Sequence, residues 1–109
     1  MDFQAYQERS RETARYPEAG RNAIYPTLGL CGEAGEVADK VKKVLRDREG
    51  RFDESVRDDL RLELGDVLWY VAQLATELDL RLEDIATANL EKLASRAARN
   101  VIGGSGDRR

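Results

Sequence analysis

The chain has 109 residues, of which 41% are hydrophobic and 36% are charged, and its formal net charge is −3. Basic and acidic residues are interspersed without a basic excess, so DNA or RNA is not expected as a partner. The length predicts a single domain over residues 1–109, whose modest core favours a homo-oligomer, either a dimer or a tetramer.

The residue types exclude several kinds of site. The chain contains no histidine and only one cysteine, Cys31. Histidine-based catalysis, zinc sites built from histidine or cysteine, and internal disulfides are therefore excluded. No apolar run approaches the roughly 20 residues that span a bilayer, and the N-terminus lacks the hydrophobic stretch of a signal peptide. We therefore expect no membrane association and a cytoplasmic location.

The first half of the chain predicts two helices. Residues 3–15 form a weakly amphipathic stretch that Pro17 and Gly20 end, which predicts a short peripheral helix. Residues 24–45 predict a long helix, in which Pro26 is tolerated in the first turn. Its apolar positions have the spacing of a core-facing stripe. They are Ala34, Val37, Ala38, Val41, Val44 and Leu45.

The second half predicts two more helices and a tail. Residues 54–78 follow Asp53 or Ser55 as N-cap, and residues 82–98 follow a turn at 79–81. The expected core positions of the third helix are Leu60, Leu64, Val67, Leu68, Val71, Leu74, Ala75 and Leu78, and those of the fourth are Ile85, Ala86, Leu90, Leu93 and Ala97. The glycine-rich segment 103–109 is not expected to be regular. The fold class is therefore all-α, resembling a four-helix bundle.

A pair of acidic residues occurs twice, thirty positions apart. Glu33-Ala-Gly-Glu36 lies in the second predicted helix and Glu63-Leu-Gly-Asp66 in the third. With Ala34 and Leu64 taken as the core centres, each pair lies at about 260° and 200° around its helix. Antiparallel packing would then bring the four carboxylates together at one edge of the bundle, although the rotation alone does not establish this. Such a cluster needs a cation.

Two glycines accompany the acids and bear on the same hypothesis. Gly35 and Gly65 each lie between the acids of a pair, at a cost of about 1 kcal/mol relative to alanine in a helix. Either a ligand approaches closely there, or two helices cross closely, or the acids are ordinary solvated residues. Oxygen ligands without histidine or cysteine suit Mg²⁺, with Mn²⁺ as a substitute.

The segment from Tyr25 to Lys43, together with Glu63-Leu-Gly-Asp-Val-Leu-Trp-Tyr70, resembles the MazG-like nucleoside triphosphate pyrophosphohydrolases of the all-α superfamily. The resemblance covers residues 22–109. It implies the MazG fold, completed by homo-oligomerisation, and cleavage of a nucleoside triphosphate between the α and β phosphates, in nucleotide-pool control or house-cleaning. It also implies four metal ligands and catalytic residues. These are Glu33, Glu36, Glu63 and Asp66, with Glu33 or Glu36 as the general base.

The resemblance further implies substrate-binding residues. Asn89, Lys92 and Arg96 follow the family's pattern for the helix that lines the nucleotide pocket, although an ordinary solvated face remains an alternative. Lys40, Lys43 and Tyr70 are further candidates. Their alternatives are an ion pair between Lys40 and Glu36, and plain packing of Tyr70. The tail resembles one that could close over a phosphate chain, or it is a disordered terminus.

Two other classes of protein share these sequence features. A binding module would hold metal and nucleotide without cleaving the nucleotide. A structural helical dimer with acidic edges would bind neither. An incubation with nucleotide and metal, with Glu63→Gln as control, separates the three.

Overall fold

The computed structural model describes residues 1–108, which form four α-helices and no strand. The helices are α1 (Phe3–Ser10), α2 (Ile24–Asp47), α3 (Glu54–Glu77) and α4 (Leu82–Ala98), and a 3-10 turn, η1 (Arg11–Thr13), follows α1. The all-α prediction is confirmed, and the last three helices agree with their predicted bounds to within two residues. Arg109, which ends the predicted tail, lies outside the described residues.

Helix α1 is shorter than predicted. Asp2 caps its start, since the side chain accepts from Ala5 N–H at 2.7 Å. At its other end, Ser10 Oγ donates to the Gln7 carbonyl and Thr13 Oγ1 donates to the Ser10 carbonyl. Such side-chain bonds compete with the helical pattern. The chain tightens into η1 and then becomes extended at Ala14.

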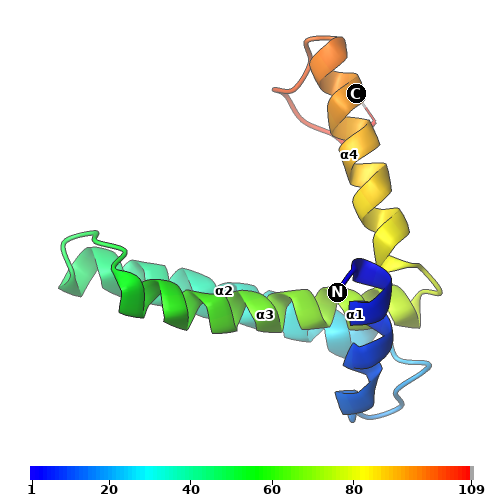
Figure 1. The fold of residues 1–109 in the computed structure, drawn as a ribbon, viewed down its shortest axis with the longest axis horizontal. Coiled ribbons are helices and arrows are strands. Elements are labelled where there is room, and N and C mark those ends of the chain that lie inside the picture. Colours follow the sequence, from blue (N-terminus) through cyan, green and yellow to red (C-terminus); the bar gives the residue numbers. More distant parts are fainter. Residues whose placement is uncertain (109) are drawn as a thin grey trace.

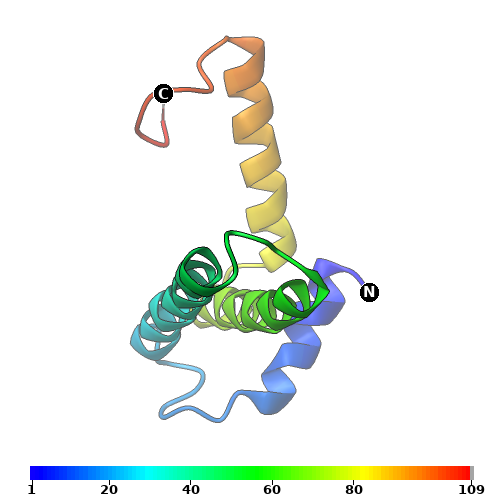
Figure 2. The same cartoon turned by 90° about the vertical axis from the view of Figure 1, so that its left-hand side faces the viewer.

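Helices α2 and α3 form a long antiparallel hairpin (Figures 1 and 2). The connection is short, and Asp53 caps α3 by accepting from Val56 N–H at 3.0 Å, as predicted. This hairpin carries both acidic pairs. Short connections favour antiparallel neighbours, so the repeat in the sequence becomes a juxtaposition in space.

The predicted centres of the α2 and α3 stripes are wrong. Ala34 is exposed, and Leu64 is 56% exposed. The covered positions of α2 are centred instead on Val37, Val41 and Val44. Both helices carry apolar residues on more than one side, and a two-helix hairpin covers only one of them. Ala38, Leu45 and Leu78 are predicted core residues that are also exposed.

Helix α4 projects away from the hairpin (Figure 1). Its contacts are with α1 and α3, and they lie near its first turn, where Leu82 is buried. The predicted burial of its apolar face is wrong for the single chain, since Leu90 is 68% exposed and Ile85, Leu93 and Ala97 are also exposed. A helix that contacts its neighbours only at one end cannot cover a stripe of four turns.

A buried polar network joins α1 and the following loop to α3. Glu77 has a fully buried side chain. It accepts from Tyr16 Oη at 2.6 Å and from the backbone N–H groups of Gly20 and Asn22 at 2.8 and 2.6 Å, and it pairs with Arg11 at 3.3 Å. This network fixes the chain that leads into α2. Over residues 1–108, no helix is long and apolar enough to cross a membrane.

Candidate metal centre

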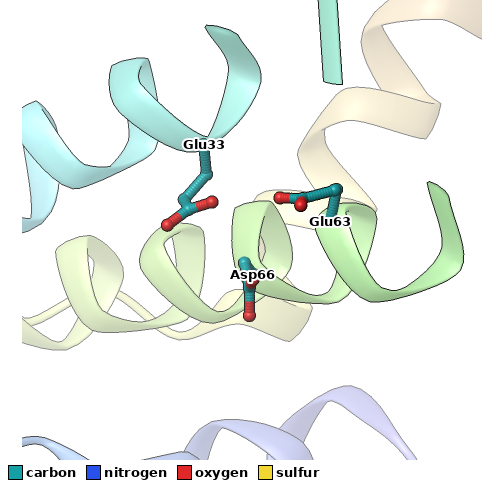
Figure 3. A group of neighbouring side chains, drawn as sticks. All are labelled: Glu33, Glu63 and Asp66. Carbon is teal, nitrogen blue, oxygen red and sulfur yellow. The ribbon is translucent and has the colours of Figure 1, made fainter. Parts of the chain in front are cut away.

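Three of the four predicted metal ligands converge between α2 and α3. Carboxylate oxygens of Glu33, Glu63 and Asp66 all lie within 4.8 Å of one another. Figure 3 shows Glu33 extending from α2 toward the two acidic side chains of α3. Glu33 and Glu63 are half-buried, whereas Asp66 is exposed. The group is therefore covered on one side and open to solvent on the other.

The rotation of α2 explains why Glu36 is not in this group. Val37, which lies on the covered face, is about 40° from Glu33 and about 100° from Glu36 around the helix. Glu33 is therefore carried into the hairpin interface, and Glu36 is exposed. The predicted convergence of four carboxylates holds for three of them, at the interface of the hairpin rather than beside its core.

The acidic groups act on one another. Burial raises the pKa of Glu33, and the charges of Asp66, Glu63 and Glu36 raise it further. The charge of Glu36 therefore affects the pKa of Glu33, although Glu36 lies outside the group. Like charges held together in a partly covered site favour any species that neutralises them. A hard cation with oxygen ligands is such a species.

Lys40 is the basic residue closest to the acids. Its Nζ lies 3.0 Å from Glu63 Oε1, and this contact raises the pKa of Lys40. The alternative pairing with Glu36 is therefore wrong. Lys43 pairs with Asp39 at 2.9 Å. Both lysines border an open cavity of about 310 Å³ beside the acidic group. The cavity is also lined by Val44, Asp47, Arg48, Val56, Asp59 and Leu60.

Tyrosines lie at the opposite end of the acidic group. Tyr70 is partly covered, and burial raises its pKa, with Tyr25 and Glu33 adding to the rise. A Cβ atom on Gly29 would overlap the Tyr70 ring, so glycine lets this ring lie against α2. The ring of Tyr25 stacks on that of Tyr16, with centroids 5.2 Å apart. The sequence does not point to Tyr25 or Gly29 as directly as to the acids. The signal it offers is a run of three glycines, Gly29, Gly32 and Gly35, within one predicted helix.

The two glycines of the acidic pairs have open surroundings. No atom lies within 4 Å of a Cβ built on Gly35 or Gly65, apart from neighbours in the helix. Within the described chain, the close helix crossing considered above is therefore absent at both positions. Over residues 1–108, the space beside both glycines is therefore open to a ligand or to another copy.

The predicted substrate-binding residues of α4 lie away from the acidic group. Asn89, Lys92 and Arg96 are on the helix that projects from the hairpin (Figure 1). Asn89 is exposed, whereas Lys92 and Arg96 bind the C-terminal tail. A single chain does not place these residues in one pocket with Glu33, Glu63 and Asp66.

The chain is similar to a known protein family and to a phage protein. Residues 25–100 match the model of the MazG nucleotide pyrophosphohydrolase domain. The chain is also 53% identical to the Gene 37 protein of Mycobacterium phage L5, over 114 aligned positions that cover all of both chains. No solved structure matches the chain.

Proposed function

Because the chain belongs to the MazG nucleotide pyrophosphohydrolase family, and is thus a hydrolase of phosphoanhydride bonds, we propose that it cleaves nucleoside triphosphates between the α and β phosphates. The products are a nucleoside monophosphate and pyrophosphate. The reaction depends on Mg²⁺, which Mn²⁺ replaces, and serves nucleotide-pool control or house-cleaning. The whole of residues 1–109 acts as one domain.

The observation that carries this proposal is the convergence of Glu33, Glu63 and Asp66. Enzymes of this family generally depend on a divalent metal ion. Three carboxylates with oxygens within 4.8 Å of one another form a donor set that would suit Mg²⁺, a cation that prefers oxygen ligands. The absence of histidine and the position of Cys31, outside the group, match this preference for a hard ion. Glu36, whose charge acts on Glu33, would join this ligand set by turning its exposed side chain toward the group.

The four acidic residues have two roles in the proposed reaction, metal binding and proton transfer. When bound, Mg²⁺ stabilises charge on the phosphate oxygens and makes a coordinated water more acidic. Glu33, Glu36, Glu63 and Asp66 would hold the ion, and their carboxylates would orient a water molecule for in-line attack on the α phosphorus. One of the two glutamates of α2, Glu33 or Glu36, accepts the proton of that water.

The phosphate chain is bound by cationic side chains. Lys40 and Lys43 lie on one side of the acids and reach phosphate oxygens from α2, while Tyr70 bounds the site on the other side. Asn89, Lys92 and Arg96 come from the α4 helix of another copy, because α4 of the same chain projects away from the acids. This arrangement requires a homo-oligomer, a dimer or a tetramer.

The test is an incubation of the full chain with a panel of canonical and modified nucleoside triphosphates and Mg²⁺, followed by anion-exchange separation of the products. We expect monophosphate and pyrophosphate that appear only with metal. Glu63→Gln should lower the rate by about two orders of magnitude or more, since metal binding provides several kcal/mol of transition-state stabilisation. Glu54→Gln, the same change in the first turn of α3, should leave it unchanged. Diphosphate and orthophosphate would place the cleavage elsewhere, and binding without turnover would indicate a binding module.

A further inference from the structure

The C-terminal tail turns back along α4. Asn100, with φ 59°, ends the helix, and Val101 N–H donates to the Arg96 carbonyl at 2.8 Å. Gly104 and Gly106 have φ of 101° and 89°, in the left-handed region that glycine adopts without strain. The tail is thus turned back by residue types suited to these conformations, and it brings Asp107 onto the last turns of α4.

One oxygen of Asp107 binds both cations of this helix. Asp107 Oδ1 lies 3.1 Å from Lys92 Nζ and 3.7 Å from an Arg96 guanidinium nitrogen. The same Arg96 nitrogen donates to the Gly106 carbonyl at 3.2 Å. Lys92 and Arg96 are four positions apart, so they share a face of α4 and converge on a single acceptor.

The two partners of this contact differ in their exposure. The Arg96 side chain is 5% exposed, whereas that of Asp107 is 84% exposed. Arg96 is therefore buried, Lys92 is 34% exposed, and the carboxylate lies at the surface. Hydrogen bonding and the charge of Lys92, with that of Arg96, lower the pKa of Asp107, so the group is ionised at neutral pH. The ion pair between Lys92 and Asp107 is exposed to solvent, and such pairs contribute little to stability, so the carboxylate is easily exchanged.

We propose that Asp107 is an internal substitute for a phosphate group, and that the phosphate chain of a nucleotide displaces it from Lys92 and Arg96 and releases the tail. This inference rests on the proposed function, in which both cations contact substrate. A phosphate oxygen fits the position of Asp107 Oδ1, where two donors already converge. Pyrophosphate carries more negative charge than one carboxylate, and charge-assisted bonds to phosphate are strong. The free protein thereby keeps two cations paired until substrate arrives.

Release of the tail can be measured without catalysis. Inorganic pyrophosphate is added to the full chain in the presence of EDTA, and heteronuclear ¹H–¹⁵N NOEs are recorded for the amides of Gly104 and Asp107. We expect these NOEs to fall toward the values of a mobile terminus as pyrophosphate saturates. Lys92→Met should remove the response. NOEs that stay unchanged at saturating pyrophosphate would overturn the inference, as would an absence of binding.

The affinity of the Asp107→Asn variant for pyrophosphate is a second test, because the inference and its alternative predict changes in opposite directions. If Asp107 competes with phosphate, Asp107→Asn should tighten pyrophosphate binding by about two- to five-fold, the range expected for loss of an exposed ion pair. Glu91→Gln removes the same charge from the residue that precedes Lys92 in α4, and it serves as the matched control. If Asp107 instead holds the two cations in place for substrate, Asp107→Asn will weaken binding, and the inference fails.

These measurements separate the inference from the proposed function. If pyrophosphate releases the tail but the protein hydrolyses no nucleotide, the displacement of Asp107 is supported and the proposed hydrolysis is wrong. Hydrolysis without tail release would retain the reaction and reject the exchange.

Discussion

Lys40 pairs with one of the acids of the candidate metal centre. Its contact with Glu63 offsets part of the negative charge of the acidic group. A cation at the same carboxylates would compete with this lysine, whereas a phosphate chain would attract it. Because both side chains are only partly covered, the ion pair contributes modestly.

The first prediction follows from this competition. Lys40→Ala should raise the affinity for Mg²⁺ in the absence of nucleotide by about two- to five-fold and raise the KM for triphosphate. Isothermal titration calorimetry and steady-state kinetics measure the two effects. Lys42→Ala, which removes the same charge from a residue paired with Asp39, is the control. A variant with weaker Mg²⁺ binding would show that Lys40 helps to hold the carboxylates in place.

The acidic group was predictable in part, because the spacing of the acids along each helix determines which side of the helix they lie on. The repeated pair on two antiparallel helices brought three of the four carboxylates together as expected. The fourth, Glu36, lies outside the group because the covered face of α2 is centred on Val37 and not on Ala34. The role of Asp107 was not predictable, since its contacts depend on a turn far from any regular pattern.

At the scale of the elements, glycines divide into those that contact something within the chain and those that do not. Gly29 lies under the Tyr70 ring, whereas Gly35 and Gly65 face open space. The cost of a helical glycine is therefore explained within the chain at one position only.

The second prediction contrasts these positions. Gly29→Ala should displace the Tyr70 ring and lower the free energy of unfolding by about 1–3 kcal/mol, as overpacking does. Gly65→Ala should raise the free energy of unfolding by up to about 1 kcal/mol through helix propensity. Urea denaturation monitored by circular dichroism compares the two variants. Destabilisation by Gly65→Ala would show that another chain approaches α3 there.

Glu77 joins η1 and the loop at 16–22 to α3. The third prediction concerns how its ionisation makes the stability of the fold depend on pH. Burial alone would raise its pKa, but hydrogen bonds from Tyr16, Asn22 and Gly20 and the charge of Arg11 lower it from 4.5 to about 2. The unfolded chain therefore takes up a proton at higher pH than the folded one. The contribution to stability, on the order of 3 kcal/mol, is complete above pH 4.5 and is lost as the pH falls toward 2.

Urea denaturation between pH 7 and pH 2 tests this expectation. Glu77→Gln should lower the free energy of unfolding at pH 7 by about 3 kcal/mol, because it disrupts a buried charged network. The variant should also lose much of the decline in stability below pH 4.5. A variant with the stability and acid sensitivity of the parent chain would show that the network does not hold the α1–α2 connection.

The helices themselves were predictable because their ends carry local signals. Asp53 caps α3 and Pro26 lies in the first turn of α2, so the bounds of these helices follow from short stretches of sequence. Pro17 and Gly20 do not mark the end of α1, which ends at Ser10. The buried face of each helix was not predictable, because it depends on how many other helices pack against that helix. Leu64 and Leu90 have the spacing of core residues and yet are exposed in the single chain.

At the scale of the whole molecule, the chain leaves much apolar surface uncovered. Leu28 is 66% exposed, Leu62 is 70% exposed and Leu90 is 68% exposed. The shape is extended, with α4 projecting from the hairpin (Figure 1), and these three side chains stay largely exposed. Apolar exposure on this scale is typical of surfaces that associate.

The fourth prediction concerns this association. Leu90→Asp should shift the protein toward the monomer and lower nucleotide hydrolysis, because α4 residues of one copy would no longer reach the acids of another. Light scattering coupled to size exclusion gives the mass. Ala88→Asp, which places the same charge about 200° around α4, is the control. A monomeric parent chain with full activity would contradict the shared site.

The central claim is that Glu33, Glu63 and Asp66 together hold a divalent cation, and calorimetric titration of the metal-free protein with Mg²⁺ tests it most directly. We predict saturable binding to the parent chain and to Glu54→Gln, and at least tenfold weaker binding to Glu33→Gln and Glu63→Gln. Equal binding by all four proteins, or no binding by the parent chain with and without nucleotide, would contradict the account.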